Sequence, residues 1–181
     1  MKRGVVGFSL IEMMIVVVII AILTLIGLPS VAEWLQNSRT RSVAESLQNG
    51  IRYAEGEAAR MSRLTTIATT SAGGWTVTYT QIASGHDTVP TTLESSPHDN
   101  LDFVTITPDS GDHAALQFND LGRVFASSSA TGTFAALTSD ASFVIANSKG
   151  PRRLTVRVSP SGKVRMCDPD KSFSDTSPDG C

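Results

Sequence analysis

The stretch "VVGFSLIEMMIVVVIIAILTLIGLP", from Val5 to Pro29, decides how the chain is organised. Residues 8–28 form a run of 21 positions that is interrupted by few polar side chains. A helix that crosses a bilayer needs about 20 mostly apolar residues. Lys2 and Arg3 precede the run, and the positive-inside rule therefore places the N-terminus in the cytoplasm. We expect one membrane-spanning segment, with the rest of the chain outside the cytoplasm.

A cleaved secretory signal peptide is the alternative interpretation of this stretch. Such a peptide has a shorter apolar core, followed by a cleavage site of small residues. Here the apolar core is longer, and the sequence "GLPS" at residues 27–30 matches a cleavage site poorly. The membrane span is the favoured interpretation.

Glu12 is the one charged residue within the span. A charged side chain at the centre of a membrane helix costs roughly 2.5–3.5 kcal/mol on insertion scales. Glu12 lies only one turn into the span, so its carboxylate can reach the cytoplasmic headgroups while its stem stays in lipid. This explanation needs no partner, and a second one follows from the resemblance described below.

Beyond Pro29 the sequence stays helical but becomes amphipathic. Apart from one gap at Ser38–Arg39, apolar residues recur every three or four positions, as on one buried stripe of a helix. The stripe consists of Val31, Leu35, Val43, Leu47, Ile51, Ala54, Ala58 and Met61. A single helix from Phe8 to about Arg63 would be roughly 84 Å long. Gly27 and Pro29 are its weak points, where we expect a kink or local melting.

From Thr65 onward, Thr, Ser and Gly dominate and short strands are predicted. The predicted strands are residues 75–82, 101–107, 115–118, 123–126, 142–146, 154–159 and 163–167. The polar segment 83–100 contains two prolines and is predicted to be a loop. We expect an α+β fold in which the helix stripe covers one face of an antiparallel sheet.

Basic residues gather near the end of the chain. Residues 64–148 contain one basic residue and eight acidic ones, whereas residues 149–165 contain six basic residues and no acidic one. Strand alternation around a turn at residues 160–162 places Arg157 opposite Arg165, and Ser159 opposite Lys163. Like charges in that arrangement repel unless they splay into water or bind an anion. The candidates for contact with DNA phosphates or with a partner protein are Arg152, Arg153, Arg157, Lys163 and Arg165. A solvated basic face is the alternative.

The chain contains two cysteines, Cys167 and Cys181. Outside the cytoplasm, a pair near the end of a chain favours a disulfide over a metal or redox site. Two unpaired thiols are the alternative. The histidines lie in different predicted loops without ligand spacing, and no nucleophile motif or phosphate-binding glycine loop is present. We expect no metal, no cofactor and no enzymatic activity.

The segment "GFSLIEMMIVVVIIAILTLIGLP" resembles the N-terminus of type IV pilins and of the related pseudopilins of type II secretion. The resemblance rests on a basic leader that ends in Gly7, on the aromatic Phe8, on Glu12 and on Pro29. It implies that a prepilin peptidase cuts after Gly7 and methylates the new N-terminus, Phe8. The span is then retained as the core of a helical filament, and Glu12 neutralises the N-terminal amine of a neighbouring subunit.

The segments "FNDLGRV" and "KGPRRLTVRVSPSGKVRMC" are similar to the GspH/FimT/FimU class of minor pilins and minor pseudopilins. The resemblance implies the type IV pilin fold, a long helix on a β-rich head. It also implies residence in the inner membrane with a periplasmic head before assembly. The expected regions are a leader (1–7), a filament-core half-helix (8–29), an amphipathic half-helix (30–63) and a head (64–181).

Three functions are compatible with this resemblance. The leading one is a minor pilin of a type IV pilus, which helps prime assembly and links other minor pilins at the tip to the major pilin of the shaft. The second is a GspH-like minor pseudopilin of type II secretion. The third is a FimT-like DNA receptor, whose Gly-Arg-x-Arg motif is matched by residues 162–165, "GKVR". Lys163 keeps the charge of the first arginine but loses its bidentate fork, and the acidic tail would repel phosphate.

Overall fold

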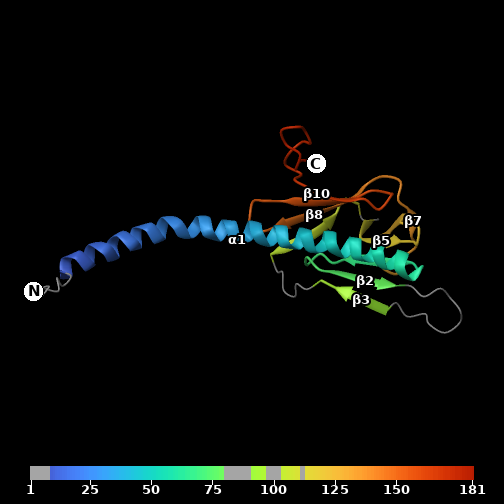
Figure 1. Ribbon diagram of the computed structural model, residues 1–181, viewed down its shortest axis with the longest axis horizontal. Helices are drawn as coiled ribbons and strands as arrows, with labels where there is room; N and C mark the ends of the chain where they lie inside the picture. The colour runs from blue at the N-terminus through green and yellow to red at the C-terminus, as the bar shows by residue number, and fades with distance from the viewer. Residues whose placement is uncertain (1–8, 80–90, 97–102, 111–112) are drawn as a thin grey trace, which may run out of the picture.

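The computed structural model describes residues 9–79, 91–96, 103–110 and 113–181. Within them, one long helix, α1 (Leu10–Met61), projects far beyond a head made of two antiparallel sheets (Figure 1). The strands are β1 (Thr65–Thr69), β2 (Trp75–Tyr79), β3 (Thr91–Ser95), β4 (Val104–Pro108), β5 (Ala115–Phe118), β6 (Val124–Ser127), β7 (Ala135–Ala136), β8 (Ala141–Asn147), β9 (Leu154–Val158) and β10 (Val164–Cys167). This is the expected α+β arrangement, in which a long helix packs on antiparallel strands.

The head contains two sheets, and the expectation of one was wrong. The larger sheet has the order β3-β2-β1-β5-β6-β7, and the smaller has the order β10-β9-β8-β4. The strands β4 and β5 are neighbours in sequence but pair with β8 and β1, respectively. These pairings join residues far apart in the chain, and strand periodicity carries no information about them.

Three of the strands were not predicted from the sequence. β1 has the sequence "TTIAT", whose side chains are mostly polar, although Thr65, Thr66 and Ile67 are all buried. β3 lies inside the segment predicted to be a loop, and β7 is only two residues long. Residues 80–82, predicted to continue β2, lie outside the described part of the chain.

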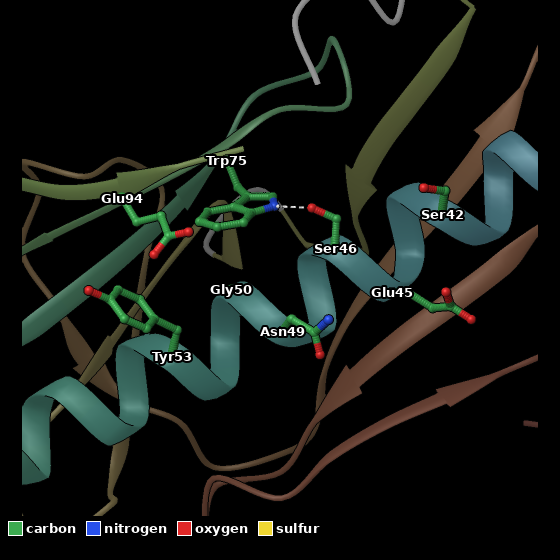
Figure 2. A pocket seen from close by; sticks show the side chains of 8 residues that line it. All are labelled: Ser42, Glu45, Ser46, Asn49, Gly50, Tyr53, Trp75 and Glu94. Atoms are coloured by element: carbon green, nitrogen blue, oxygen red, sulfur yellow. Dashed lines mark hydrogen bonds between the residues drawn. The ribbon is translucent and has the colours of Figure 1, made fainter. Parts of the chain in front are cut away.

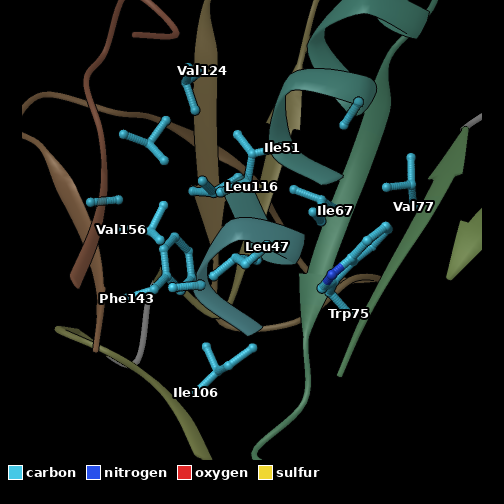
Figure 3. Close-up of a cluster of buried hydrophobic side chains, with 14 of the residues drawn as sticks. Leu47, Ile51, Ile67, Trp75, Val77, Ile106, Leu116, Val124, Phe143 and Val156 are labelled. Atoms are coloured by element: carbon cyan, nitrogen blue, oxygen red, sulfur yellow. The ribbon is translucent and has the colours of Figure 1, made fainter. Parts of the chain in front are cut away.

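The second half of α1 lies between the two sheets and forms the centre of the core. Figure 3 shows Leu47 and Ile51 of α1 among Phe143 and Val156 of the smaller sheet and Ile67 of the larger one. The predicted stripe is confirmed at Val43, Leu47, Ile51, Ala54 and Ala58, which are at most 1% exposed.

The stripe is not covered at its N-terminal end, where burial had been expected. Val31 and Leu35 are 59% and 44% exposed. Gln36, one residue after Leu35, accepts a hydrogen bond from Asn147 of the head. Periodicity identifies the apolar face of a helix, but it does not show where the covering sheets end.

The helix is unbroken at Gly27 and Pro29, so the local melting expected there is absent from this structure. Proline removes one backbone donor from a helix and thereby leaves a carbonyl without its partner. Nearby hydroxyls bond other carbonyls of this region: Ser30 Oγ donates to Gly27 O at 2.9 Å, and Thr24 Oγ1 donates to Ile20 O at 2.7 Å. Figure 1 shows a gently curved rod through these positions.

Candidate functional site

The N-terminal half of α1 presents an apolar surface that no other part of the described chain covers. An 18-residue window of this helix has a mean hydropathy of 2.9, none of it is buried, and by length and composition the helix could cross a membrane. Side chains at residues 10–25 are all exposed. A surface of this size requires lipid or other protein chains as its surroundings.

Glu12 is the one charged residue of this apolar surface, and its side chain is exposed. It lies in the first turn of α1, where the helix dipole favours a carboxylate. The backbone N–H of Glu12 donates to Ser9 O at 3.1 Å. Gly7 and Phe8, the expected cleavage and methylation positions, lie outside the described residues.

The hairpin of β9 and β10 has the register predicted from its turn. Val158 faces Val164, Val156 faces Met166, and Arg157 faces Arg165. The turn requires Gly162, whose φ of +82° favours glycine; a Cβ there would also lie 2.7 Å from Glu55 Oε1 of α1. Burial raises the pKa of this Glu55 carboxyl, and Arg52 opposes the shift.

Three of the four arginines of the predicted basic face, Arg153, Arg157 and Arg165, have partners within the head. Arg153 pairs with Asp170, and Arg157 Nη2 lies 3.5 Å from Asp140 Oδ2. Arg165 Nη2 donates to Pro178 O at 3.2 Å and Gly180 O at 2.8 Å. The opposed Arg157 and Arg165 are therefore tolerated because each guanidinium has its own partner. Lys163 and Arg152 form no ion pair with any residue that the structure describes.

The C-terminal tail, residues 168–181, folds back on β10 and supplies several of these partners. The expected disulfide between Cys167 and Cys181 is present. The N–H of Cys181 donates to Asp168 O and Lys171 O, and the Arg165 guanidinium lies 4.6 Å from the centroid of the Phe173 ring. The hydrogen bond from Lys171 lowers the pKa of Asp179. Asp168, Asp170 and Asp179 of the tail thus have cationic partners, which the sequence pattern did not reveal.

An open cavity of 480 Å³ lies between α1 and the edge of the larger sheet (Figure 2). Its wall includes Trp75, whose Nε1 donates to Ser46 Oγ at 3.1 Å. The indole packs directly on Gly50, where a Cβ would lie 2.8 Å from Trp75 Cε2. Burial raises the pKa of Tyr53, and the carboxylates of Glu57 and Glu94 add to the shift. Aromatic rings beside carboxylates suit a cationic side chain. The sequence analysis missed this cavity, because the contact between Trp75 and Gly50 joins residues that are far apart in the chain.

No group of three or more potential ligands that could hold a metal occurs among the described residues. His113 Nδ1 lies 2.6 Å from Asp109 Oδ1, whereas His86 and His98 lie outside those residues.

Comparisons with known proteins give two family matches and several structural ones. The family model described as "Type II transport protein GspH" matches residues 43–162, and the "Prokaryotic N-terminal methylation motif" matches residues 7–28. No curated protein matches significantly. The type IV minor pilin FimU of Pseudomonas aeruginosa (strain PAO1) is 21% identical over 78% of this chain and 97% of its own, with a TM-score of 0.52. The solution structure of E. coli GspH is 14% identical over 76% and 94%, with a TM-score of 0.51. These likenesses show a shared fold.

Proposed function

Since the chain belongs to the GspH family of minor pilins and minor pseudopilins, we propose that it is a minor pilin of a type IV pilus. In this role it is a structural subunit without catalytic activity, which helps prime assembly and links other minor pilins at the tip to the shaft. The uncovered apolar half of α1, with its single carboxylate, carries the proposal. A helix of this kind needs a membrane before assembly and neighbouring helices after it.

Before assembly, the proposed subunit resides in the inner membrane, with the N-terminus in the cytoplasm and the head in the periplasm. A prepilin peptidase cuts after Gly7 and methylates Phe8, in keeping with the methylation-motif match at residues 7–28. The new amine of Phe8 then pairs with Glu12 of a neighbouring subunit, while the head contacts other minor pilins and the major pilin.

A minor pseudopilin of a type II secretion system is the second candidate, and the description of the matching family favours it. Deletion of the gene separates the two functions when surface pili and secreted proteins are measured in the same strain. We expect loss of surface pili with secretion intact, and restoration of pili by the wild-type gene. Loss of secretion with normal piliation would replace the first function by the second.

The hairpin is not expected to bind duplex DNA at physiological salt. Because Arg153, Arg157 and Arg165 have partners in the head, Lys163 is the hairpin cation that remains for phosphate. One contact gives a slope of about −0.9 for log affinity against log salt, whereas three or four contacts would give about −3. The measurement is a titration of fluorescent duplex with the full chain in detergent, at several salt concentrations.

Lys163→Ala is the matched variant for this titration. Arg165→Ala is unsuitable, because the exposed Arg165 guanidinium also donates to Pro178 O and Gly180 O of the tail. A slope near −3 in the wild type, which Lys163→Ala makes shallower, would restore the DNA receptor as a serious candidate.

A further inference from the structure

A groove of 480 Å³ lies at the end of the head nearest the apolar half of α1. It is formed by α1 and by the loop that joins β8 to β9; its lining is Ala32, Glu33, Gln36, Lys149 and Pro151. Ala32 and Gln36 follow Leu28 by four and eight residues, which corresponds to roughly 6 and 12 Å along the helix. The headgroup layer on each side of a bilayer is about 5–8 Å thick. The membrane-side end of the groove, at Ala32 and Glu33, is therefore at headgroup height when the span lies in a membrane, and Gln36 lies about one helical turn above it.

The walls of this groove are held together by specific contacts. Asn147 Nδ2 donates to Gln36 O at 3.3 Å and to Gln36 Oε1 at 3.1 Å, and Lys149 N donates to Asn147 Oδ1 at 2.9 Å. At Gly150 the loop approaches α1 so closely that a Cβ would lie 3.1 Å from Gln36 Cβ. The Lys149 ammonium lies 3.2 Å from the centroid of the Phe103 ring. The loop and the helix thus present a preformed site.

The groove holds one carboxylate and one ammonium that do not pair. Neither Glu33 nor Lys149 forms an ion pair within the described part of the chain. Gln36 Oε1 is already occupied by Asn147, which leaves its Nε2 amide available as a donor. Trp34, 68% exposed on the same stretch of α1, is of the residue type that concentrates at membrane interfaces.

We propose that this groove binds the headgroup of phosphatidylethanolamine while the subunit resides in the membrane. The phosphate accepts hydrogen bonds from Lys149 Nζ and Gln36 Nε2, and the ethanolamine ammonium donates to the Glu33 carboxylate. Phosphatidylcholine offers no N–H donor, and phosphatidylglycerol offers no cation for Glu33. The proposal rests on the proposed function, because it requires the span to be in a bilayer. Binding would fix the orientation of the head above the membrane until assembly displaces the lipid.

The test uses the full chain in lipid vesicles, with collisional quenching by a trace lipid that carries a nitroxide on its headgroup. Because Cys167 and Cys181 are paired, one introduced cysteine can carry the fluorophore. The labelled variants are Ser148→Cys beside the groove, Ser30→Cys at the membrane end of the helix, and Ser161→Cys at the far hairpin turn. Vesicles of phosphatidylcholine are compared with vesicles that also contain phosphatidylethanolamine.

We expect the label at residue 148 to be quenched more strongly when phosphatidylethanolamine is present. Loss of one charge-assisted hydrogen bond lowers the affinity for the headgroup about tenfold or more. Lys149→Ala should therefore reduce quenching in both lipids, and Glu33→Gln should remove the difference between them. Lys163→Ala is the matched control: it removes the same charge just before β10, next to Gly162, which faces Glu55 roughly 28 Å farther along α1 than Gln36. It should change nothing.

The three labels distinguish two kinds of failure. If the label at residue 30 is quenched but the label at residue 148 behaves like that at residue 161, the groove is empty and the lipid site is refuted. Equal quenching of wild type in both lipids would overturn the recognition of ethanolamine. If the label at residue 30 is not quenched, the chain is not anchored as proposed, and the proposed function itself fails.

Discussion

Glu12→Ala is expected to lower the amount of this protein in sheared filaments by about a hundredfold or more. In the proposed filament core, the Glu12 carboxylate pairs with the N-terminal amine of a neighbouring subunit. Removal of one partner from a buried ion pair typically costs about 3–5 kcal/mol, because the other charge stays buried alone. A change of that size corresponds to roughly two to four orders of magnitude in an equilibrium constant.

The same substitution should leave the earlier steps intact. It makes the span more apolar, so membrane insertion does not suffer. Mass spectrometry of the membrane-bound variant should show a chain that begins at methylated Phe8, as in the wild type. Glu12→Asp is the control that keeps the charge on a shorter side chain, and it should retain part of the incorporation. Wild-type amounts of Glu12→Ala in sheared filaments would show that this ion pair is dispensable.

Replacement of both cysteines by serine should destabilise the head and release its tail. Cys167 and Cys181 are 14 residues apart, and closure of a loop of this size is worth about 3 kcal/mol in the chain-entropy model. For a head of this length, that loss lowers the thermal midpoint by roughly 6–12 °C. The upper end of this temperature range applies if the tail stays folded until the whole head unfolds. If the tail frays before the head unfolds, the shift in thermal midpoint is smaller. The measurement is thermal unfolding of the full chain in detergent, followed by near-UV circular dichroism.

Hydrogen exchange provides the matched local measurement for the same variant. The N–H of Cys181 donates to Asp168 O and Lys171 O, and protection of this amide should be lost together with the disulfide. Chemical reduction of the wild type should reproduce both effects. Thiol labelling of the unreduced, denatured wild type should find no free cysteine. Unchanged stability and unchanged tail protection in the double variant would show that the salt bridge Arg153–Asp170 and the hydrogen bonds from Arg165 to the tail hold it without the disulfide.

The hairpin illustrates what the sequence can and cannot predict about a site. Its register followed from strand alternation and a short turn, and Val158 does face Val164. The contacts of its arginines could not be predicted from the sequence, because their partners lie in other segments of the chain. Asp140 precedes β8, whereas Asp170 belongs to a tail whose path depends on the disulfide. Local chemistry was thus predictable, and charge pairing between distant segments was not.

The head shows the same limit at the level of the fold. The stripe of α1 could be predicted because a helix carries its own period, as Leu47 and Ile51 confirm. The division into two sheets depends on pairings such as β1 with β5, which bring Ile67 opposite Leu116. Because the paired strands are far apart in the chain, local composition does not indicate that they pair. The polar strand β1 was missed for a related reason, since its threonines are buried by the surrounding fold and not by their own hydrophobicity.

The continuity of α1 has a mechanical consequence. One rod links the proposed filament core to the head, and both sheets contact its second half. A pull on the head is therefore transmitted to the core along a column of parallel backbone hydrogen bonds, without an intervening hinge to absorb it. The load enters the rod through side chains such as Val43, Leu47 and Ile51, which are spread over more than two turns. Tension on the tip is thus shared by several packed layers, and no single contact has to bear it.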